Sequence, residues 1–222
     1  MPSFGDAERA AVATLGINPS KQEFATAGQL LRGSFARFRC LPDLGVASLR
    51  EASMDVIADV YQGCQQYFHR RPYRKWFDRL EEQLRAVGAS YYDGSAAHLD
   101  LAHWATDPTW GDLTPDQRER LLEDGRSFLQ WQLSRPHLRL VMLNGRAVIL
   151  QFELWSGCPL QPVGQLPGPL GRAANLYRAT LPGGALVLGW STNLQSSFGV
   201  TTAFRGLLAG AMKRLYSSGR AA

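Results

Sequence analysis

Hydrophobic and polar residues follow one another along the chain in blocks that predict strands separated by amphipathic helices. Short apolar runs at 10–15 (AAVATL), 98–104 (HLDLAHW) and 138–143 (LRLVML) have the length of buried strands. Two further strands, 176–180 and 185–189, are joined by Pro-Gly-Gly and predict a hairpin. The stretch 157–171, rich in proline and glycine, reads as a long surface loop.

Helix starts are marked by capping residues placed before apolar positions at helical spacing. Ser48 and Glu51 form one capping box and Thr114 and Gln117 a second, while Pro72 has the fixed backbone angle of a first helical position. A last helix is predicted over 204–215, where apolar residues form one stripe. Strands that alternate with helices predict an α/β fold with a mainly parallel sheet covered on both faces.

In such a sheet the functional site lies at the carboxyl ends of the strands. The loops of interest therefore begin at Gly16, Trp104, Asn144 and Trp190. We see no internal repeat and no linker, so we expect one domain over residues 1–222.

Composition narrows the class of protein. The chain has 222 residues, of which 45% are hydrophobic and 19% charged, and this excludes a disordered or fibrous protein. No apolar run approaches the roughly 20 residues that a membrane span needs, so we expect a cytoplasmic protein without a membrane partner. Cys40, Cys64 and Cys158 lack metal-ligand spacing, so neither a disulfide framework nor a bound metal is expected.

Charge is distributed unevenly along the chain. The net charge is +5, and Glu153 is the last acidic residue. The residues after Glu153 contain no acid, which favours binding to the phosphate backbone of a nucleic acid. A surface whose charge only keeps the protein soluble is an equal alternative. Its basic residues are Arg172, Arg178, Arg205, Lys213, Arg214 and Arg220.

One loop places a carboxamide directly after the first predicted strand. In Gly16-Ile-Asn-Pro-Ser20, Pro19 stiffens the backbone and Gly16 permits close approach of a ligand. A fixed Asn18 can orient a water molecule, whereas the alternative is that it caps the next turn.

This loop resembles the first active-site motif of the uracil-DNA glycosylase superfamily, particularly its mismatch-specific branch, where Gly-Ile-Asn-Pro-Gly is typical. The resemblance implies a three-layer α/β/α sandwich that flips a nucleotide into a pocket and hydrolyses its N-glycosidic bond without metal or cofactor. Asn18 would position the hydrolytic water, and Gly16 and Ile17 would lie against the base. The order of the remaining strands agrees with this layout.

The last motif departs from that family. Where His-Pro-Ser or Asn-Pro-Ser is usual, this chain has Trp190-Ser-Thr-Asn-Leu194. By the resemblance, Asn193 would stabilise the departing base, Ser191 and Thr192 would hold phosphate, and Leu194 would be the wedge that fills the vacated stack. The alternative is a Ser/Asn-rich turn.

The second strand departs as well. The family often places a base-reading Asn there, whereas this chain has Ala102, His103 and Trp104, which leaves space for a bulkier base. Asp100 shares a strand face with His98 and requires a partner or a polar cleft. We expect Asp107 to face the pocket as a catalytic carboxylate, unless it caps a turn.

Aromatic and basic side chains complete the candidate site. Trp104, Trp110 and Trp190 lie in or beside strand-end loops, where indoles stack on bases or pack in the core. Phe68 is our candidate for the base-stacking aromatic, and Asn144 lines the pocket or forms a turn. Two sets of basic residues can contact phosphate. The first can equally be a solvated helix face and consists of Arg70, Arg71, Arg74 and Lys75. The second consists of Arg205 and Arg214.

Together these observations predict a monomeric, monofunctional DNA glycosylase that binds DNA and removes a modified base. A hypermodified, glucosylated cytosine of phage DNA is the leading substrate. The alternatives are excision of uracil or a deaminated base, and a DNA-binding domain of the same fold without activity. A Rossmann-type nucleotide enzyme is disfavoured because no Gly-x-Gly-x-x-Gly follows the first strand.

Overall fold

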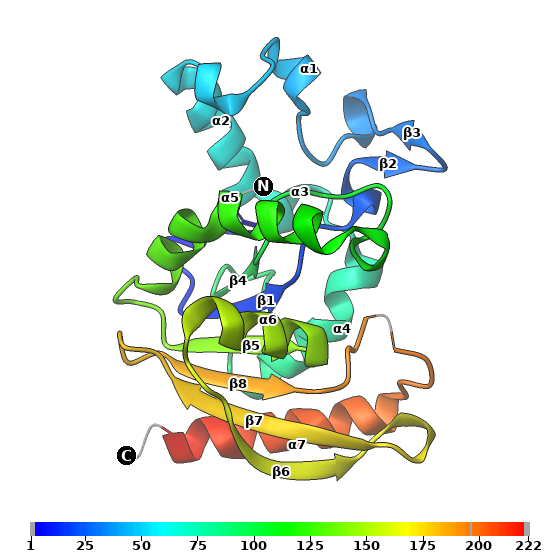
Figure 1. Ribbon diagram of the computed structural model, residues 1–222, viewed down its shortest axis with the longest axis vertical. Coiled ribbons are helices and arrows are strands. Elements are labelled where there is room, and N and C mark those ends of the chain that lie inside the picture. Colours follow the sequence, from blue (N-terminus) through cyan, green and yellow to red (C-terminus); the bar gives the residue numbers. More distant parts are fainter. Residues whose placement is uncertain (1–2, 196, 220–222) are drawn as a thin grey trace.

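The centre of the protein is a six-stranded mixed sheet with the order β4-β1-β5-β8-β7-β6 (Figure 1). The computed structural model describes residues 3–195 and 197–219, so Arg220 lies outside the described residues. Four strands are parallel: β4 (Ala96–Asp100), β1 (Val12–Gly16), β5 (Leu140–Asn144) and β8 (Leu186–Trp190). The antiparallel strands β7 (Ala173–Thr180) and β6 (Gln161–Pro167) extend one edge.

Helices cover both faces of this sheet, because successive strand residues are apolar on both sides. Helices α4 (Arg74–Ala86) and α7 (Thr202–Gly219) pack on the face that carries Val12, Met142 and Leu188. Helices α5 (Pro115–Leu133) and α6 (Arg146–Ser156) pack on the face of Leu15 and Leu143. The predicted α/β sandwich is confirmed.

Three local predictions need correction. Ser48 caps only the short turn η3 (Leu49–Glu51), and helix α2 (Met54–Gln65) begins later, where the Ser53 hydroxyl accepts a bond from the Val56 amide. The stretch predicted as a loop contains β6, whose two prolines are tolerated because it is the outermost strand of the sheet. The second strand ends at Asp100, since the chain then bonds to the loop after β1.

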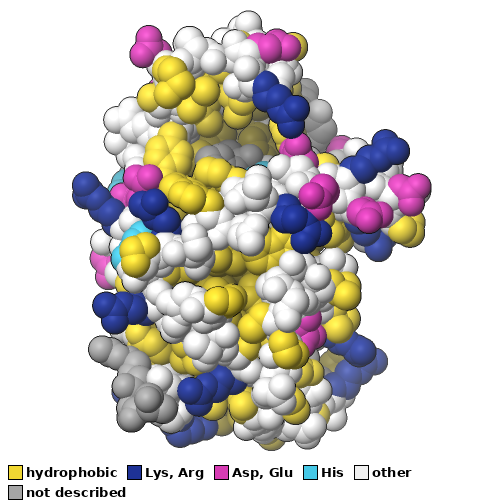
Figure 2. Space-filling model, turned by 60° about the vertical axis from the view of Figure 1, so that its left-hand side comes forward, with side chains coloured by type: hydrophobic (Ala, Val, Ile, Leu, Met, Phe, Trp, Pro, Cys, Tyr) yellow, Lys and Arg dark blue, Asp and Glu magenta, His cyan; other side chains and the backbone are white. Residues whose placement is uncertain are grey.

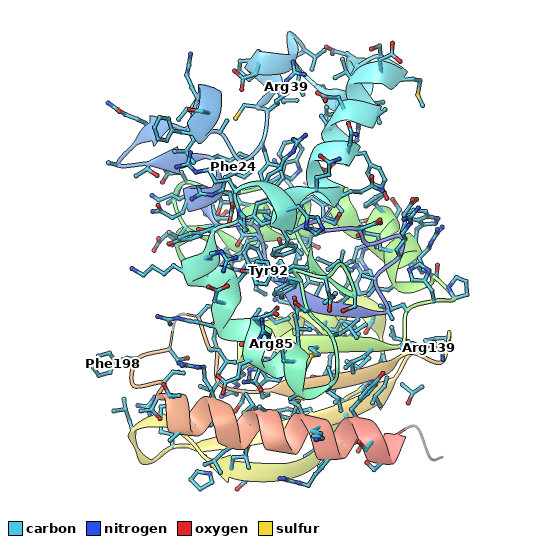
Figure 3. All side chains as sticks on the ribbon, turned by 180° about the vertical axis from the view of Figure 1, so that it is seen from behind. Phe24, Arg39, Arg85, Tyr92, Arg139 and Phe198 are labelled. Carbon is cyan, nitrogen blue, oxygen red and sulfur yellow. The ribbon has the colours of Figure 1, made fainter. Side chains whose placement is uncertain are left out.

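A long excursion between β1 and α4 stands above the sandwich (Figure 1). We call residues 21–65 the arm. It contains η1 (Lys21–Glu23), β2 (Ala25–Thr26), β3 (Gln29–Leu30), η2 (Gly33–Phe35), α1 (Leu41–Leu44), η3 and α2. Figure 3 shows Arg39 far out on the arm and Phe24 nearer the body of the protein. The short α3 (Tyr67–Arg70) then leads to α4.

Beneath the arm, aromatic rings fill the core between α3, α4 and the sheet. Phe68 is buried and stacks on Tyr91 with ring centroids 4.4 Å apart. Tyr67 and Phe77 make T-shaped contacts with the same ring. Phe68 therefore has no ring face to offer a base, and its predicted stacking role is wrong.

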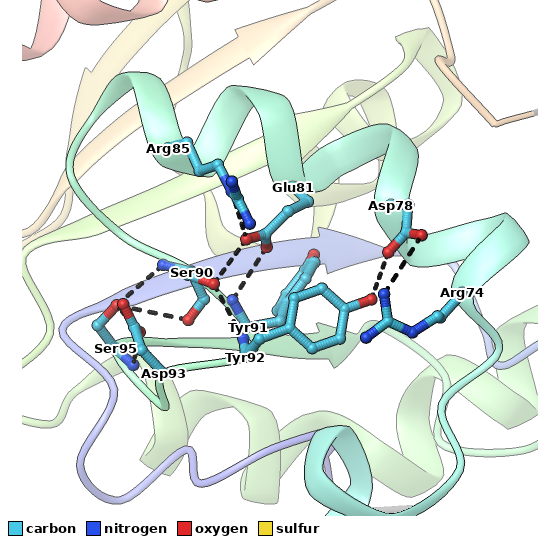
Figure 4. A network of polar contacts seen from close by, with 9 residues as sticks. All are labelled: Arg74, Asp78, Glu81, Arg85, Ser90, Tyr91, Tyr92, Asp93 and Ser95. Carbon is cyan, nitrogen blue, oxygen red and sulfur yellow. Dashed lines mark hydrogen bonds and ion pairs between the residues drawn. The ribbon is translucent and has the colours of Figure 1, made fainter.

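A polar network fastens α4 to the turn that precedes β4 (Figure 4). The buried Glu81 carboxylate accepts bonds from the Ser90 hydroxyl at 2.6 Å, the Tyr91 amide at 3.1 Å and the Arg85 guanidinium at 3.0 Å. These bonds offset the free-energy cost of removing the Glu81 carboxylate from water.

Among the described residues, no helix has both the length and the apolar character needed to cross a bilayer.

Candidate functional site

The loop after β1 is fixed against the segment that follows β4. Gly16 and Ile17 accept backbone bonds from Leu101 at 3.1 Å and Ala102 at 2.8 Å. A β-carbon added at Gly16 would lie 2.5 Å from Asp100 Oδ1, so only glycine fits beside that carboxylate. The close packing that the sequence suggested at Gly16 is therefore against the protein's own strand β4.

Asn18 ties the two loops together through its amide nitrogen. Nδ2 donates to the Trp104 carbonyl, the Thr106 hydroxyl and the Pro19 carbonyl, each at 3.2 Å. All three contacts use the nitrogen, so the carbonyl oxygen Oδ1 takes no part in them. The side chain is half-buried and its orientation is fixed.

A pocket of about 970 Å³ opens beside this junction, between the arm and the body of the protein. Figure 2 shows the hollow, with hydrophobic side chains gathered around it. The volume is near the upper end of the roughly 300–1,000 Å³ usual for ligand pockets. The arm contributes an aliphatic wall of Leu30, Leu41, Leu44, Leu49, Ile57 and Val60. The body contributes His103, Trp104, Thr106, Asp107, Asp124 and Phe128.

Polar and charged groups stand at the edge of this pocket. Lys21 Nζ lies 3.3 Å from Asp107 Oδ1, and the Asp107 side chain is 77% exposed. Trp104 keeps its ring in the wall by donating from Nε1 to Asp124 Oδ2 at 2.7 Å. The structure therefore brings Asp107 and Trp104 together beside the loop after β1, whereas Gly16, Ile17 and Asn18 of that loop are not among the residues that line the pocket.

His103 has a different environment from these edge residues. Its ring packs edge-on against Phe128 at 5.6 Å and against Gly125 of α5. Burial lowers the pKa of His103 from 6.5 to about 4, so the imidazole is neutral at physiological pH. A neutral ring in the wall can exchange hydrogen bonds with a ligand without contributing charge.

Sequence reasoning missed the contribution of η1. Gln22 and Phe24 line the pocket, whereas the Glu23 side chain between them is buried. Glu23 Oε2 accepts a bond from the Tyr67 hydroxyl at 2.7 Å, and burial raises the pKa of this carboxyl to about 7. Ser20, which caps η1, was the available sign that a turn starts here.

A buried polar chain runs along β1 and β4 below the loop. Thr14 Oγ1 bonds to Tyr91 Oη and, at 2.7 Å, to His98 Nδ1. The other ring nitrogen of His98 lies 3.4 Å from Asp100 Oδ1. The partner of Asp100 is thus a histidine on the same strand, and not the arginine that usually accompanies a buried carboxylate.

The carboxyl ends of β5 and β8 form a closed hydrogen-bonded junction. Asn144 Oδ1 accepts from Trp190 Nε1 at 3.0 Å and from the Leu194 amide at 2.9 Å. Its Nδ2 donates to Asn193 Oδ1 at 3.3 Å and Gln195 Oε1 at 2.8 Å. Asn144 is buried and holds the loop after β8 in place, so it does not line the pocket.

Burial contradicts the roles predicted for Trp190 and Leu194, whereas the roles predicted for Ser191, Thr192 and Asn193 stay predictions. Trp190 and Leu194 are fully buried, so neither can stack on a base nor enter a duplex. Ser191 Oγ accepts from the Asn175 amide at 2.9 Å, which gives it a structural partner, while Thr192 is half-buried. Asn193 Oδ1 also accepts from the Gln195 amide at 2.8 Å and is therefore part of the junction.

Two further predictions need revision. Ala102 is fully buried and lies outside the pocket, so the large space is beneath the arm and not at Ala102. Arg205 forms an ion pair with Glu82 at 3.0 Å, so this cation already has a partner within the protein. Arg214 is exposed on α7, and neither arginine lines the pocket.

Comparison with known proteins adds no assignment: no family model matches the chain, and no curated protein matches it.

Proposed function

We propose that this protein is a DNA glycosylase that hydrolyses the N-glycosidic bond of a flipped, modified nucleotide. The observation that carries the proposal is the position of Asn18, two residues after β1, where its side chain bonds to Trp104 and Thr106 of the pocket wall. Its Nδ2 is held by three acceptors, so Oδ1 can accept a hydrogen bond from a water molecule and aim it at the sugar carbon. Fixing a nucleophile in this way lowers the entropic part of the barrier.

The size and lining of the pocket support a base larger than uracil. At about 970 Å³ it has room for a base together with a bulky substituent. Phe24 and Trp104 offer aromatic surface on which a base or the apolar face of a sugar can stack.

Topology also supports the proposal. Strand β1 lies between β4 and β5, so the connections that follow β1 and β5 leave the sheet in opposite directions. Ligands of open α/β sheets bind at such a switch point, outside the carboxyl ends of the strands. The loop with Asn18 begins at this point.

The test is an abasic-site reporter assay on three DNAs: uracil-containing, deaminated, and phage-modified with glucosylated cytosine. We expect abasic sites on the modified DNA and slow action on uracil. Asn18→Ala should lower single-turnover excision about a hundredfold or more and leave DNA affinity nearly unchanged, because it removes the group that positions the water. Thermal melting of this variant checks that loss of the Asn18 bonds to Trp104 and Thr106 leaves the fold intact. Excision by Asn18→Ala at the wild-type rate would refute the assignment. Binding of all three DNAs without abasic sites would indicate a DNA-binding domain.

A further inference from the structure

Two basic segments, distant in sequence, meet beside the loop after β1. One spans 32–39 in the arm and the other spans 70–79 at the start of α4. Asp78 is the single acidic residue in the two segments. Their cations are Arg32, Arg37, Arg39, Arg70, Arg71, Arg74, Lys75 and Arg79.

Contacts between side chains and backbone join the two segments. Arg71 Nη1 donates to the Ser34 carbonyl at 2.8 Å, and its guanidinium lies 4.8 Å from the centre of the Phe35 ring. Arg37 lies 5.3 Å from the centre of the Tyr73 ring. The arm is thereby held against the turn between α3 and α4.

The same segments are bonded to both strand-end loops. Arg37 Nη1 donates to the Gln22 carbonyl at 2.7 Å, and Gln22 lines the pocket. Arg79 Nη1 donates to the carbonyls of Leu194 at 3.2 Å and Gln195 at 2.9 Å, in the loop after β8. The basic surface therefore lies at the edge of the sheet where the strands end, on the same side as Asn18.

Six of these cations are exposed, and one of them, Arg39, forms a close ion pair with Asp59. We call the other five the basic corner: Arg32, Arg70, Arg71, Arg74 and Lys75. Within the described part of the chain, only Arg74 among them has a carboxylate within 4.0 Å, that of Asp78 (Figure 4). Arg39 and Arg205, by contrast, are neutralised by Asp59 at 2.6 Å and Glu82 at 3.0 Å.

Aromatic rings are interleaved with the cations of the basic corner. Phe35 is 61% exposed beside Arg71, and the Arg74 guanidinium lies 4.5 Å from the centre of the Tyr92 ring. A positive surface with exposed aromatic rings is the arrangement by which proteins bind nucleic acid strands, because phosphates meet the cations and bases stack on the rings.

We propose that the basic corner binds the phosphate backbone of the DNA strand whose nucleotide enters the pocket, and that Phe35 stacks on an unpaired base of that strand. The identification of the polyanion as DNA rests on the proposed function. The position of the corner, between the arm and the loop after β8, orients the strand across the mouth of the site. The acid-free helix α7 then stays outside the interface.

The test measures the affinity of a fluorescent DNA strand by anisotropy between 50 and 200 mM salt. The variant Arg70→Ala/Lys75→Ala removes two exposed cations whose side chains have no hydrogen bond or ion pair with the described residues. Lys213→Ala/Arg214→Ala removes two exposed cations from α7 and is the matched control. The corner variant should lower the log–log salt slope by about 1.4, because each phosphate contact on a single strand contributes about 0.7. The control variant should retain the wild-type slope.

Phe35→Ala should weaken the binding of single-stranded DNA at least fivefold at constant salt concentration. It should leave the salt slope unchanged, because stacking involves no counterion release. Thermal melting of each variant checks that the fold is retained.

The outcomes separate this inference from the proposed function. Binding through the corner without abasic sites would refute the glycosylase and leave the inference standing. Excision with wild-type salt slopes in the corner variant would refute the inference and leave the glycosylase standing. A lower salt slope for Lys213→Ala/Arg214→Ala would also overturn the inference. The absence of DNA binding by the wild-type protein at 50 mM salt would do the same.

Discussion

Replacement of Glu23 by glutamine should stabilise the protein at neutral and alkaline pH but not in acid. The Glu23 side chain is 1% exposed, and its Oε1 has no hydrogen-bond partner among the described residues. Burial raises the pKa of Glu23 from 4.5 to about 7 and outweighs the lowering effects of the Tyr67 hydroxyl and of Arg37. The nearby Asp100 raises the pKa further.

The magnitude follows from this pKa. A rise from 4.5 to about 7 corresponds to about 3 kcal/mol, at 1.36 kcal/mol for each pH unit. Between these two values the folded protein holds a proton that the unfolded chain has released, so the free energy of unfolding falls as the pH rises. Above pH 7 the full cost of a buried carboxylate is present, and below pH 4.5 it is absent.

Glutamine has the shape of glutamate and does not ionise, so Glu23→Gln removes this cost. Denaturant unfolding from pH 4 to pH 8 should show near-equal stability for both proteins at pH 4, below the ordinary pKa of 4.5. At pH 8 the variant should be more stable by up to about 3 kcal/mol. The exposed Glu119→Gln on α5 is the control and should show no such divergence. A pH-independent difference, or a variant less stable at pH 8, would refute the reasoning.

Two further substitutions test the geometry of the strand ends. Gly16→Ala places a β-carbon 2.5 Å from Asp100 Oδ1 and should lower both the melting temperature and excision, whereas Gly28→Ala, which meets nothing within 4 Å, tests a positive backbone angle alone. Melting temperatures unchanged by Gly16→Ala would contradict the close packing. Leu194→Ala creates a cavity in the core and should cost about 2–5 kcal/mol in denaturant unfolding. If Leu194→Ala instead lowered excision from paired DNA without any loss of stability, that result would contradict the burial of Leu194.

The order of elements could be predicted because apolar periodicity and capping residues are local properties. The capping box at Thr114 and the hairpin between β7 and β8 are present as the sequence indicated. Strand β6 was missed because prolines and glycine interrupt its pattern, and its pairing with β7 decides its conformation. The start of α2 moved because Ser48 and Ser53 are both competent caps.

The candidate site divides in the same way. The sequence alone determined that a stiff loop with Asn18 follows a buried strand, since Pro19 and Gly16 act on the local backbone. It also indicated that the loop after β4 lies next to it, because parallel neighbouring strands end at the same edge. The hydrogen bonds of Asn18 to Trp104 and Thr106 agree with that prediction.

Only the tertiary structure decided which side chains of these loops face solvent and which face the core. Trp190, Leu194 and Phe68 have residue types that suit a ligand site equally well, but burial of apolar surface draws them inward. Asn144 accepts two hydrogen bonds in the core, because the buried donors of Trp190 and of the loop after β8 need an acceptor. The pocket wall and the basic corner both come from the arm, whose position depends on contacts between residues far apart in sequence, such as Arg71 with Ser34. Such contacts leave no periodic pattern along the chain, which is why the sequence could place Asn18 but not the surface around it.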